Sequence, residues 1–304
     1  MGARICEGRI VIVTGSGRGL GREHALAFAR AGAKVVVNDL GAAVDGSGSS
    51  GGPAGEVVDL IRSEGGEAVV NGSDVADWAG AKALVEQAVD TFGGLDVLVN
   101  NAGFLRDRML ANCTEEEWDA VMRVHLKGHF APTRHAIEYW KTQSKAGVEV
   151  CGRIINTSSG AGLMGSVGQG NYAAAKAGIA ALTLVESAEF GRYGVTANAI
   201  APAARTRMTE QVFAATMAEP AEGEFDAMDP ANISPLVVWL GSVESAAVTG
   251  RVFEVEGGKV SVCDGWQHGE VTDKGARWSP EELGPVVEGL LAQAPAPAPV
   301  YGAR

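Results

Sequence analysis

Short runs of apolar residues recur along the chain, separated by longer stretches whose apolar positions repeat with a helical period. Continuous apolar runs are typical of strands buried on both faces of a parallel sheet, and helical stretches cover those faces. Seven strands are predicted, at Arg9–Thr14, Lys34–Asp39, Ala68–Asn71, Leu95–Asn100, Arg153–Thr157, Val195–Ile200 and Arg251–Val255. Because strands and helices alternate, we expect an α/β fold with one mainly parallel, doubly wound sheet and helices on both faces.

The pattern of strands and helical stretches predicts one α/β domain with a short tail rather than two domains. Helices are predicted at Gly21–Ala31, Pro53–Glu64, Ala79–Phe92, from Thr114 to about residue 142, and at Tyr172–Phe190. The fourth begins with a capping box, because Glu117 follows Thr114 by three residues. A Gly/Ser-rich loop at 41–55 is expected to be flexible, either exposed or touching a ligand. The domain is expected to cover residues 1–285 and to be followed by an Ala/Pro-rich tail at 286–304, in which Ala294–Val300 should be extended.

The first predicted strand leads into a glycine-rich turn, Gly15-x-x-x-Gly19-x-Gly21, and then into a helix. Glycines permit a tight turn and close approach of the backbone to a pyrophosphate, whose charge the helix N-terminus favours. The strand–turn–helix context, with an acidic residue about 20 positions further on, indicates a Rossmann-fold dinucleotide site. The residues expected to contact the dinucleotide here are Gly15, Ser16, Arg18, Gly19, Leu20 and Gly21.

The acidic residue is Asp39, which closes the second predicted strand and is followed by Leu40. A carboxylate at this position accepts hydrogen bonds from the adenosine ribose and repels a 2′-phosphate, which favours NAD. Arg18 argues in the other direction, because a basic side chain beside the loop attracts that phosphate. Since the carboxylate faces the ribose directly, NAD is the predicted cofactor.

Ser159, Tyr172 and Lys176 form a candidate catalytic group. Tyr172 and Lys176 are four residues apart and therefore share one face of a helix. A positive charge beside a phenol favours the phenolate, so Lys176, with an oxidised nicotinamide nearby, is expected to lower the pKa of Tyr172 for general acid/base catalysis. Ser159, 13 residues before Tyr172, is expected to hydrogen-bond the substrate oxygen.

The glycine turn, the NNAG sequence of Asn100–Gly103 and the Ser159, Tyr172, Lys176 spacing together resemble the short-chain dehydrogenase/reductase family. The resemblance implies that Lys176 also binds the nicotinamide ribose and that Asp74 and Val75 meet the adenine. It further implies that Asn101, Ala102, Gly103, Pro202 and Thr206 line the cofactor. His125 stands where many members carry a catalytic asparagine, so it either preserves a proton relay or is a packed or helix-capping histidine.

Several further motifs resemble one subgroup of that family. They are VNDLG followed by a glycine-rich insertion, LRDR at Leu105–Arg108, VHLKG, and an AP with a later RMT. These motifs are similar to those of the (3R)-hydroxyacyl-CoA dehydrogenase domains of type 2 peroxisomal multifunctional enzymes and their bacterial relatives. The resemblance implies a 3-hydroxyacyl-CoA or hydroxysteroid substrate and a homodimer or homotetramer built on helix-to-helix contacts.

Composition narrows the choice of partners and location. The net charge of -12 argues against a nucleic-acid or an anionic membrane surface as partner. The four cysteines lack CxxC spacing, and no metal-ligand pattern links the histidines, so no metal is expected. No apolar segment is long enough to span a bilayer and no cleavable signal is evident, so a cytoplasmic location is expected.

The leading hypothesis is therefore an NAD-dependent dehydrogenase that converts a secondary alcohol to a ketone. One alternative is a 3-oxoacyl thioester reductase, which Asp39 disfavours, and another is a dinucleotide-binding module without turnover. A bulky apolar substrate would need an adaptable pocket, although plain core packing explains the candidate side chains equally well. These candidates are Leu163, Met164, Val167, Met208, Val212, Phe213 and Met217.

Overall fold

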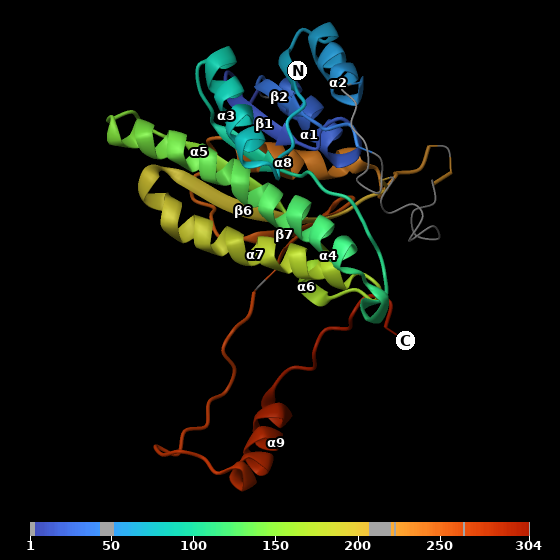
Figure 1. The fold of residues 1–304 in the computed structure, drawn as a ribbon, viewed down its shortest axis with the longest axis vertical. Helices are drawn as coiled ribbons and strands as arrows, with labels where there is room; N and C mark the ends of the chain where they lie inside the picture. The colour runs from blue at the N-terminus through green and yellow to red at the C-terminus, as the bar shows by residue number, and fades with distance from the viewer. Residues whose placement is uncertain (1–3, 43–51, 207–219, 222, 264, 304) are drawn as a thin grey trace.

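The computed structural model describes residues 4–42, 52–206, 220–221, 223–263 and 265–303. Its centre is one sheet whose strands lie in the order β3-β2-β1-β4-β5-β6-β7-β8 (Figure 1). The strands are β1 Ile10–Thr14, β2 Lys34–Asn38, β3 Glu67–Asn71, β4 Val97–Asn100, β5 Gly152–Thr157, β6 Val195–Ala203, β7 Val252–Glu256 and β8 Lys259–Cys263. All neighbouring pairs are parallel except β7 and β8. The expected doubly wound α/β fold is confirmed.

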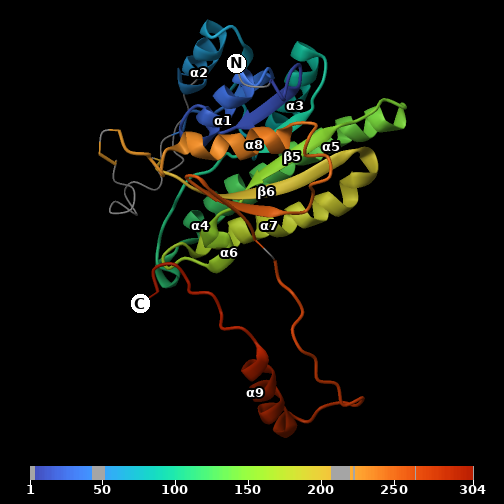
Figure 2. The same cartoon turned by 180° about the vertical axis from the view of Figure 1, so that it is seen from behind.

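Helices cover both faces of the sheet, except the last helix, α9, which lies on an arm away from it (Figures 1 and 2). They are α1 Gly19–Arg30, α2 Gly52–Ser63, α3 Trp78–Phe92, α4 Glu115–Met122, α5 Gly128–Lys145, α6 Gly160–Met164, α7 Gly170–Phe190, α8 Ser234–Gly241 and α9 Leu283–Gln293. Short helical turns are η1 Leu110–Asn112, η2 Arg123–Lys127, η3 Gly191–Tyr193, η4 Pro230–Ile233 and η5 Pro280–Glu282. In the described part of the chain, no helix combines the length and apolarity needed to cross a membrane.

The side chains of β1 point alternately to the two faces of the sheet and so pack into two separate hydrophobic cores. Val11 and Val13 pack with α1, α2 and α8 on one face, and Ile10 and Ile12 pack with α3 and α5 on the other. Successive side chains of a strand point to opposite faces, so a strand that is apolar throughout is stable only when both faces are covered. All five residues of β1 are buried, which is why its sequence does not alternate between apolar and polar.

Two features of the fold differ from the sequence prediction. The sheet has eight strands rather than seven, because β8 turns back from β7 through Gly257, whose φ is +54°. Val260 and Val262 of β8 are exposed, so this edge strand lacks the buried apolar run that marks the others. The long helix begins with the predicted Thr114–Glu117 capping box but divides into α4 and α5, which the π-helical turn η2 connects.

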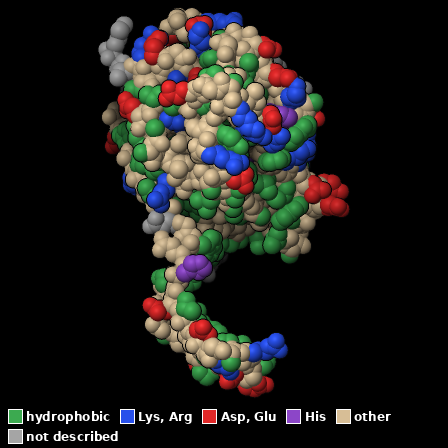
Figure 3. Space-filling view, turned by 90° about the vertical axis from the view of Figure 1, so that its left-hand side faces the viewer, with side chains coloured by type: hydrophobic (Ala, Val, Ile, Leu, Met, Phe, Trp, Pro, Cys, Tyr) green, Lys and Arg blue, Asp and Glu red, His purple; other side chains and the backbone are tan. Residues whose placement is uncertain are grey.

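The C-terminal region forms an arm that leaves the body after β8 and returns to it (Figures 1 and 2). The arm contains α9, and no side chain of that helix is buried among the described residues. Figure 3 shows the arm as a narrow projection from the body. Helix α9 ends at Gln293, and residues 294–303, which include the Ala294–Val300 segment expected to be extended, are non-helical and lead back to the body.

Buried polar side chains link the central strands to α5 and α7. Asn100 of β4 donates hydrogen bonds to Thr133 and to Asn156 of β5, each 2.9 Å long. Asn156 in turn donates to Thr183 at 3.0 Å and to a carboxylate oxygen of Glu186 at 2.7 Å. Burial raises the pKa of the Glu186 carboxyl to about 8. The network is therefore completed by a carboxyl group that is uncharged at neutral pH.

This raised pKa predicts a specific pH dependence of stability. Between pH 4.5 and 8 the unfolded chain has released the Glu186 proton while the folded protein keeps it, so the group lowers the free energy of unfolding as pH rises. From pH 5 to pH 8, Glu186→Gln should gain stability relative to wild type by on the order of a few kcal/mol. Urea unfolding at both pH values measures this gain. Glu189→Gln, an exposed neighbour on α7, is the control, and equal changes for both variants would refute the prediction.

Candidate active site

A cavity of about 920 Å³ opens at the carboxyl ends of the parallel strands, where α/β sheets bind their ligands. It brings together all but one of the predicted site residues. Those that line it are Gly15, Arg18, Gly19, Leu20, Gly21, Asp39, Leu40, Asp74, Val75, Asn101, Ala102, Gly103, His125, Ser159, Tyr172, Lys176, Pro202 and Thr206. Residues separated by almost two hundred positions therefore converge on one space.

Close backbone packing explains the glycines of the turn. Gly15 has a φ of +62°, a conformation that side chains rarely adopt. A Cβ on Gly21 would lie 2.2 Å from the Gly15 carbonyl oxygen, so α1 could not begin so close to the turn with any larger residue. Ser16 is the exception among the predicted contacts: its buried hydroxyl donates to the Val13 carbonyl at 2.7 Å. Ser16 stabilises the turn from beneath and does not line the described cavity.

Asp39 lies at the end of β2 against the same turn. One carboxylate oxygen accepts a hydrogen bond from the Gly17 amide at 2.7 Å, and the other accepts from the Gly41 amide at 2.6 Å. Each oxygen retains a lone pair, so the group can still accept a hydroxyl donor from the cavity. The two amide contacts fix the direction of the carboxylate before any ligand arrives.

Asp74 and Asn101 shape the wall beyond Asp39. Asp74 accepts hydrogen bonds from Arg123 at 2.6 Å and from the Ala76 amide at 2.8 Å. The Asn101 side chain donates to the carbonyl oxygens of Thr14 and Gly15 at 2.9 and 3.1 Å, which ties the end of β4 to the glycine turn. The resulting cleft follows the carboxyl ends of β1, β2 and β4. Its size, and the glycine turn whose backbone a ligand can approach closely, fit a dinucleotide.

Ser159 and Tyr172 come from two helices that meet at the far side of the cavity. Ser159 caps α6, accepting a hydrogen bond from the Ala161 amide at 3.2 Å, and Tyr172 lies in the first turn of α7. Burial raises the pKa of the Tyr172 phenol to about 12, although a hydrogen bond with Ser159 acts in the opposite direction. The two hydroxyls are therefore close enough to bind one oxygen atom together.

Lys176 is one turn further along α7 and is almost fully buried. Its ammonium donates a hydrogen bond to the Thr157 carbonyl at 2.6 Å and lies 5.5 Å from the centre of the Tyr172 ring. Burial lowers the pKa of Lys176 to about 7. A Cβ on Gly162 would lie 2.6 Å from the Lys176 Cβ, so a glycine in α6 lets the two helices approach here.

The pKa shifts describe the site without its ligand. Lys176 together with an oxidised nicotinamide is expected to lower the pKa of Tyr172, whereas in the chain alone burial raises the Tyr172 pKa and lowers the Lys176 pKa. Both groups are uncharged more readily than in water because burial disfavours either charge. Burial within the chain alone therefore favours the protonated phenol.

His125 lies inside the π-helical turn η2, and its ring meets that of Tyr172 edge-on at 5.1 Å. Its Nε2 is 2.7 Å from the Phe104 carbonyl oxygen, which favours the tautomer that donates from this nitrogen. Burial lowers the pKa of His125 to about 3, so the ring is neutral at working pH. These contacts favour the packed alternative for the side chain. A proton relay through this position stays a prediction.

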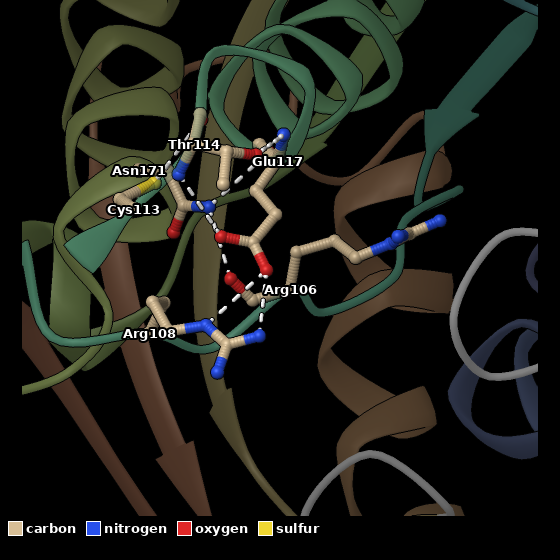
Figure 4. Close-up of polar contacts among 6 residues, drawn as sticks. All are labelled: Arg106, Arg108, Cys113, Thr114, Glu117 and Asn171. Atoms are coloured by element: carbon tan, nitrogen blue, oxygen red, sulfur yellow. Dashed lines mark hydrogen bonds and ion pairs between the residues drawn. The ribbon is translucent and has the colours of Figure 1, made fainter.

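The loop after β4 is anchored to Asn171, the residue that precedes Tyr172 (Figure 4). Glu117 of the capping box also pairs with Arg108 at 2.9 Å. The side chain of Asn171, which precedes Tyr172, donates to the carbonyl oxygens of Arg106 and Glu117 at 3.0 and 3.3 Å. The start of α4, the loop and the start of α7 are thereby held together next to Tyr172.

The apolar residues predicted to line a substrate pocket either lie outside the lining of the described cavity or fall outside the described residues. Leu163 packs against the buried cluster of Ala199, Ala201 and Val252, which is the core-packing alternative. Among the described cavity-lining residues, Leu163, Met164 and Val167 do not occur, and Met208, Val212, Phe213 and Met217 lie outside the described part of the chain. The sequence reasoning missed Thr157, whose contribution is a backbone carbonyl without any side-chain signal. It also missed Tyr301, which lines the cavity from the far end of the chain.

Residues 9–216 match the family model described as short chain dehydrogenase. The chain belongs to the short-chain dehydrogenase family. It is 48% identical over 284 residues to a Mycobacterium tuberculosis protein named hydroxyacyl-CoA dehydrogenase ChsB1, covering 91% of this chain and 86% of that one. It is 46% identical over 252 residues to the mouse peroxisomal multifunctional enzyme type 2, covering 83% of this chain but 32% of the mouse protein.

A solved structure gives the same result for the fold. The crystal structure of a short chain dehydrogenase from Mycobacterium avium superimposes with a TM-score of 0.89 at 66% identity, covering 98% of this chain and all of that one. The family resemblance inferred from the motifs is thus confirmed. This short-chain dehydrogenase is an oxidoreductase that acts on a CH–OH group with a nicotinamide dinucleotide.

The placement of Tyr172 predicts the effect of removing its hydroxyl. Tyr172→Phe should lower kcat by about 10²–10⁴-fold, the usual contribution of general acid–base catalysis, while NADH still binds. Steady-state kinetics and a fluorescence titration with NADH measure the two effects. Tyr193→Phe, at a half-buried tyrosine in η3 outside the described cavity lining, is the matched control. Undiminished turnover in Tyr172→Phe would reject Tyr172 as the acid/base.

Proposed function

We propose that this dehydrogenase uses NAD⁺ to oxidise a 3-hydroxyacyl-CoA, including acyl groups derived from steroids, to the 3-oxoacyl-CoA. The observation that carries the proposal is the hydrogen-bonded pair of Ser159 and Tyr172, beside the buried Lys176, at one end of a cavity whose other end is the glycine turn. The names of its Mycobacterium tuberculosis and mouse relatives support the acyl-CoA substrate.

The chain's own residues account for the proton and the orientation of the substrate. The Ser159 hydroxyl donates a hydrogen bond to the substrate oxygen, and the Tyr172 phenolate takes the proton from the same oxygen. Lys176, fixed by the Thr157 carbonyl, stabilises the phenolate and binds the nicotinamide ribose. When bound, the nicotinamide supplies the acceptor for the hydride that leaves the carbinol carbon.

The substrate is tested directly with a panel of (3R)-3-hydroxyacyl-CoA thioesters and hydroxysteroids. NADH formation, followed by absorbance, should be fastest with one of the acyl-CoA thioesters. A strict requirement for NADP⁺, or activity confined to small sugars, would contradict the proposal. A 3-oxoacyl thioester reductase remains the second candidate because it uses the same site in the opposite direction, but Asp39 disfavours the NADPH that biosynthetic reduction usually draws on.

The preference for NAD⁺ depends on the Asp39 carboxylate, which faces the cavity beside the glycine turn. A 2′-phosphate brought to this carboxylate is repelled in a partly dehydrated site. Asp39→Ala should therefore raise the ratio of kcat/KM for NADP⁺ to that for NAD⁺ by about tenfold or more. Kinetics with both cofactors at constant substrate test this, and an unchanged ratio would remove Asp39 as the selecting group.

The proposal also includes a homodimer or homotetramer and a cytoplasmic location. Phe130 of α5 and Leu184 and Val185 of α7 are exposed apolar side chains on adjacent helices, and such faces are suited to helix-to-helix contact between copies. The domain boundary remains the predicted one, with residues 1–285 as the catalytic domain, and the tail 286–304 as an appendage that contributes Tyr301 to the cavity.

A further inference from the structure

The last described residues of the chain lie beside the catalytic helix α6. The Tyr301 amide donates to the Gly165 carbonyl at 3.2 Å, and the Val167 amide donates to the Tyr301 carbonyl at 2.9 Å. Both backbone groups of Tyr301 are therefore used, in a parallel bridge with Ser166. Two backbone hydrogen bonds fix the residue in register, so its side chain has a defined position even though it follows a long arm.

The Tyr301 ring covers the position that follows the catalytic serine. A Cβ on Gly160 would lie 3.0 Å from the Tyr301 hydroxyl oxygen and 3.1 Å from the ring. Because Gly160 has no side chain, nothing separates the ring from the backbone next to Ser159. Tyr301 lines the same cavity as Ser159 and Tyr172, so a substrate oxygen bound by those two hydroxyls places its substituents close to Tyr301.

Exposed apolar side chains lie on the segments next to Tyr301, outside the cavity lining itself. The loop after β4 joins the segment 166–169 through a hydrogen bond from the Arg108 amide to the Gly168 carbonyl, 2.7 Å long. That segment therefore lies between the loop on one side and Tyr301 on the other. We call the exposed apolar side chains of these three segments the apolar rim, which consists of Met109, Leu110, Val167, Val300 and Tyr301.

The two ends of the cavity consequently differ in chemistry. The glycine turn, Asp39 and Asp74 offer backbone amides and carboxylates, whereas the apolar rim offers a surface that is stabilised when an apolar group covers it. Tyr301 is half exposed at 47%, so its ring has free area to contribute to such a contact.

We infer that Tyr301 is a specificity-determining residue, whose ring contacts the apolar part of the substrate beyond the reacting carbon. The inference rests on the proposed acyl-CoA function and deepens it, because it assigns the C-terminal arm a part in the site. Tyr301 selects for long or bulky acyl groups, while Ser159 and Tyr172 act on the oxygen of every substrate. The arm returns to the body at the point where this contact is made.

The experiment compares full-length wild type with Tyr301→Ala, using 3-hydroxybutyryl-CoA and 3-hydroxypalmitoyl-CoA. The ratio of kcat/KM for the long thioester to that for the short one should fall by about tenfold, because the lost ring area contacts only the long chain. Tyr301→Phe keeps the ring and should retain the wild-type ratio. Leu291→Ala, at an exposed position of α9 on the same arm, should also retain it.

A binding measurement separates this inference from the proposed reaction. Calorimetry of palmitoyl-CoA and acetyl-CoA needs no turnover, and Tyr301→Ala should weaken only the palmitoyl-CoA affinity. Loss of the long-chain preference in both assays supports the inference. An unchanged or increased preference in Tyr301→Ala, or an equal loss in Leu291→Ala, overturns it. If wild type binds palmitoyl-CoA through Tyr301 but oxidises no hydroxyacyl-CoA, the reaction is wrong and the contact stands.

Discussion

The hydrogen bond from the Lys176 ammonium to the Thr157 carbonyl, 2.6 Å long and buried, fixes the end of the cavity where Ser159 and Tyr172 lie. A second hydrogen bond joins the same two segments, because the hydroxyl of Ser158, next to Thr157, donates to the Lys176 carbonyl at 2.9 Å. The end of β5 and the first turns of α7 therefore hold one another at two points. Tyr172, one turn before Lys176, takes its position from this junction.

Burying a cation costs free energy unless hydrogen-bond acceptors surround it, and two features of the site reduce this cost for Lys176. The Thr157 carbonyl accepts from the ammonium, and burial lowers the pKa of Lys176 to about 7. Burial also raises the pKa of Tyr172 to about 12. A positive charge brought beside Tyr172 acts against this effect of burial and favours release of the phenol proton.

Much of the fold and the site could be predicted because local patterns determine them. The apolar run of β1 indicated a strand covered on both faces, and the glycines indicated a tight turn, where the structure shows close backbone packing at Gly15 and Gly21. The spacing of Tyr172 and Lys176 placed both on one helical face. Local patterns gave no warning of β8, because an exposed edge strand needs no buried apolar run. They also missed the π-helical turn at His125, because tertiary contacts decide where a long helix is interrupted.

The site features that the sequence did not predict depend on contacts between residues far apart in the chain. The Thr157 carbonyl carries no residue-type signal, and Tyr301 reaches the site only because the C-terminal arm folds back. Burial in the chain alone shifts the Tyr172 pKa in the direction opposite to the one expected from Lys176 with an oxidised nicotinamide, since spacing along the sequence says nothing about how much water surrounds either group. Sequence spacing therefore identified the participants, whereas the three-dimensional environment decides their protonation.

An NMR titration of protein carrying tyrosine labelled with ¹³C at Cζ tests that environment most directly, with Tyr172→Phe assigning the resonance among the four tyrosines. Tyr172 should remain protonated well above pH 10 in the free protein, and its titration should move to lower pH when NAD⁺ is added. Titration below pH 10 without NAD⁺, or no movement upon its addition, would contradict the account.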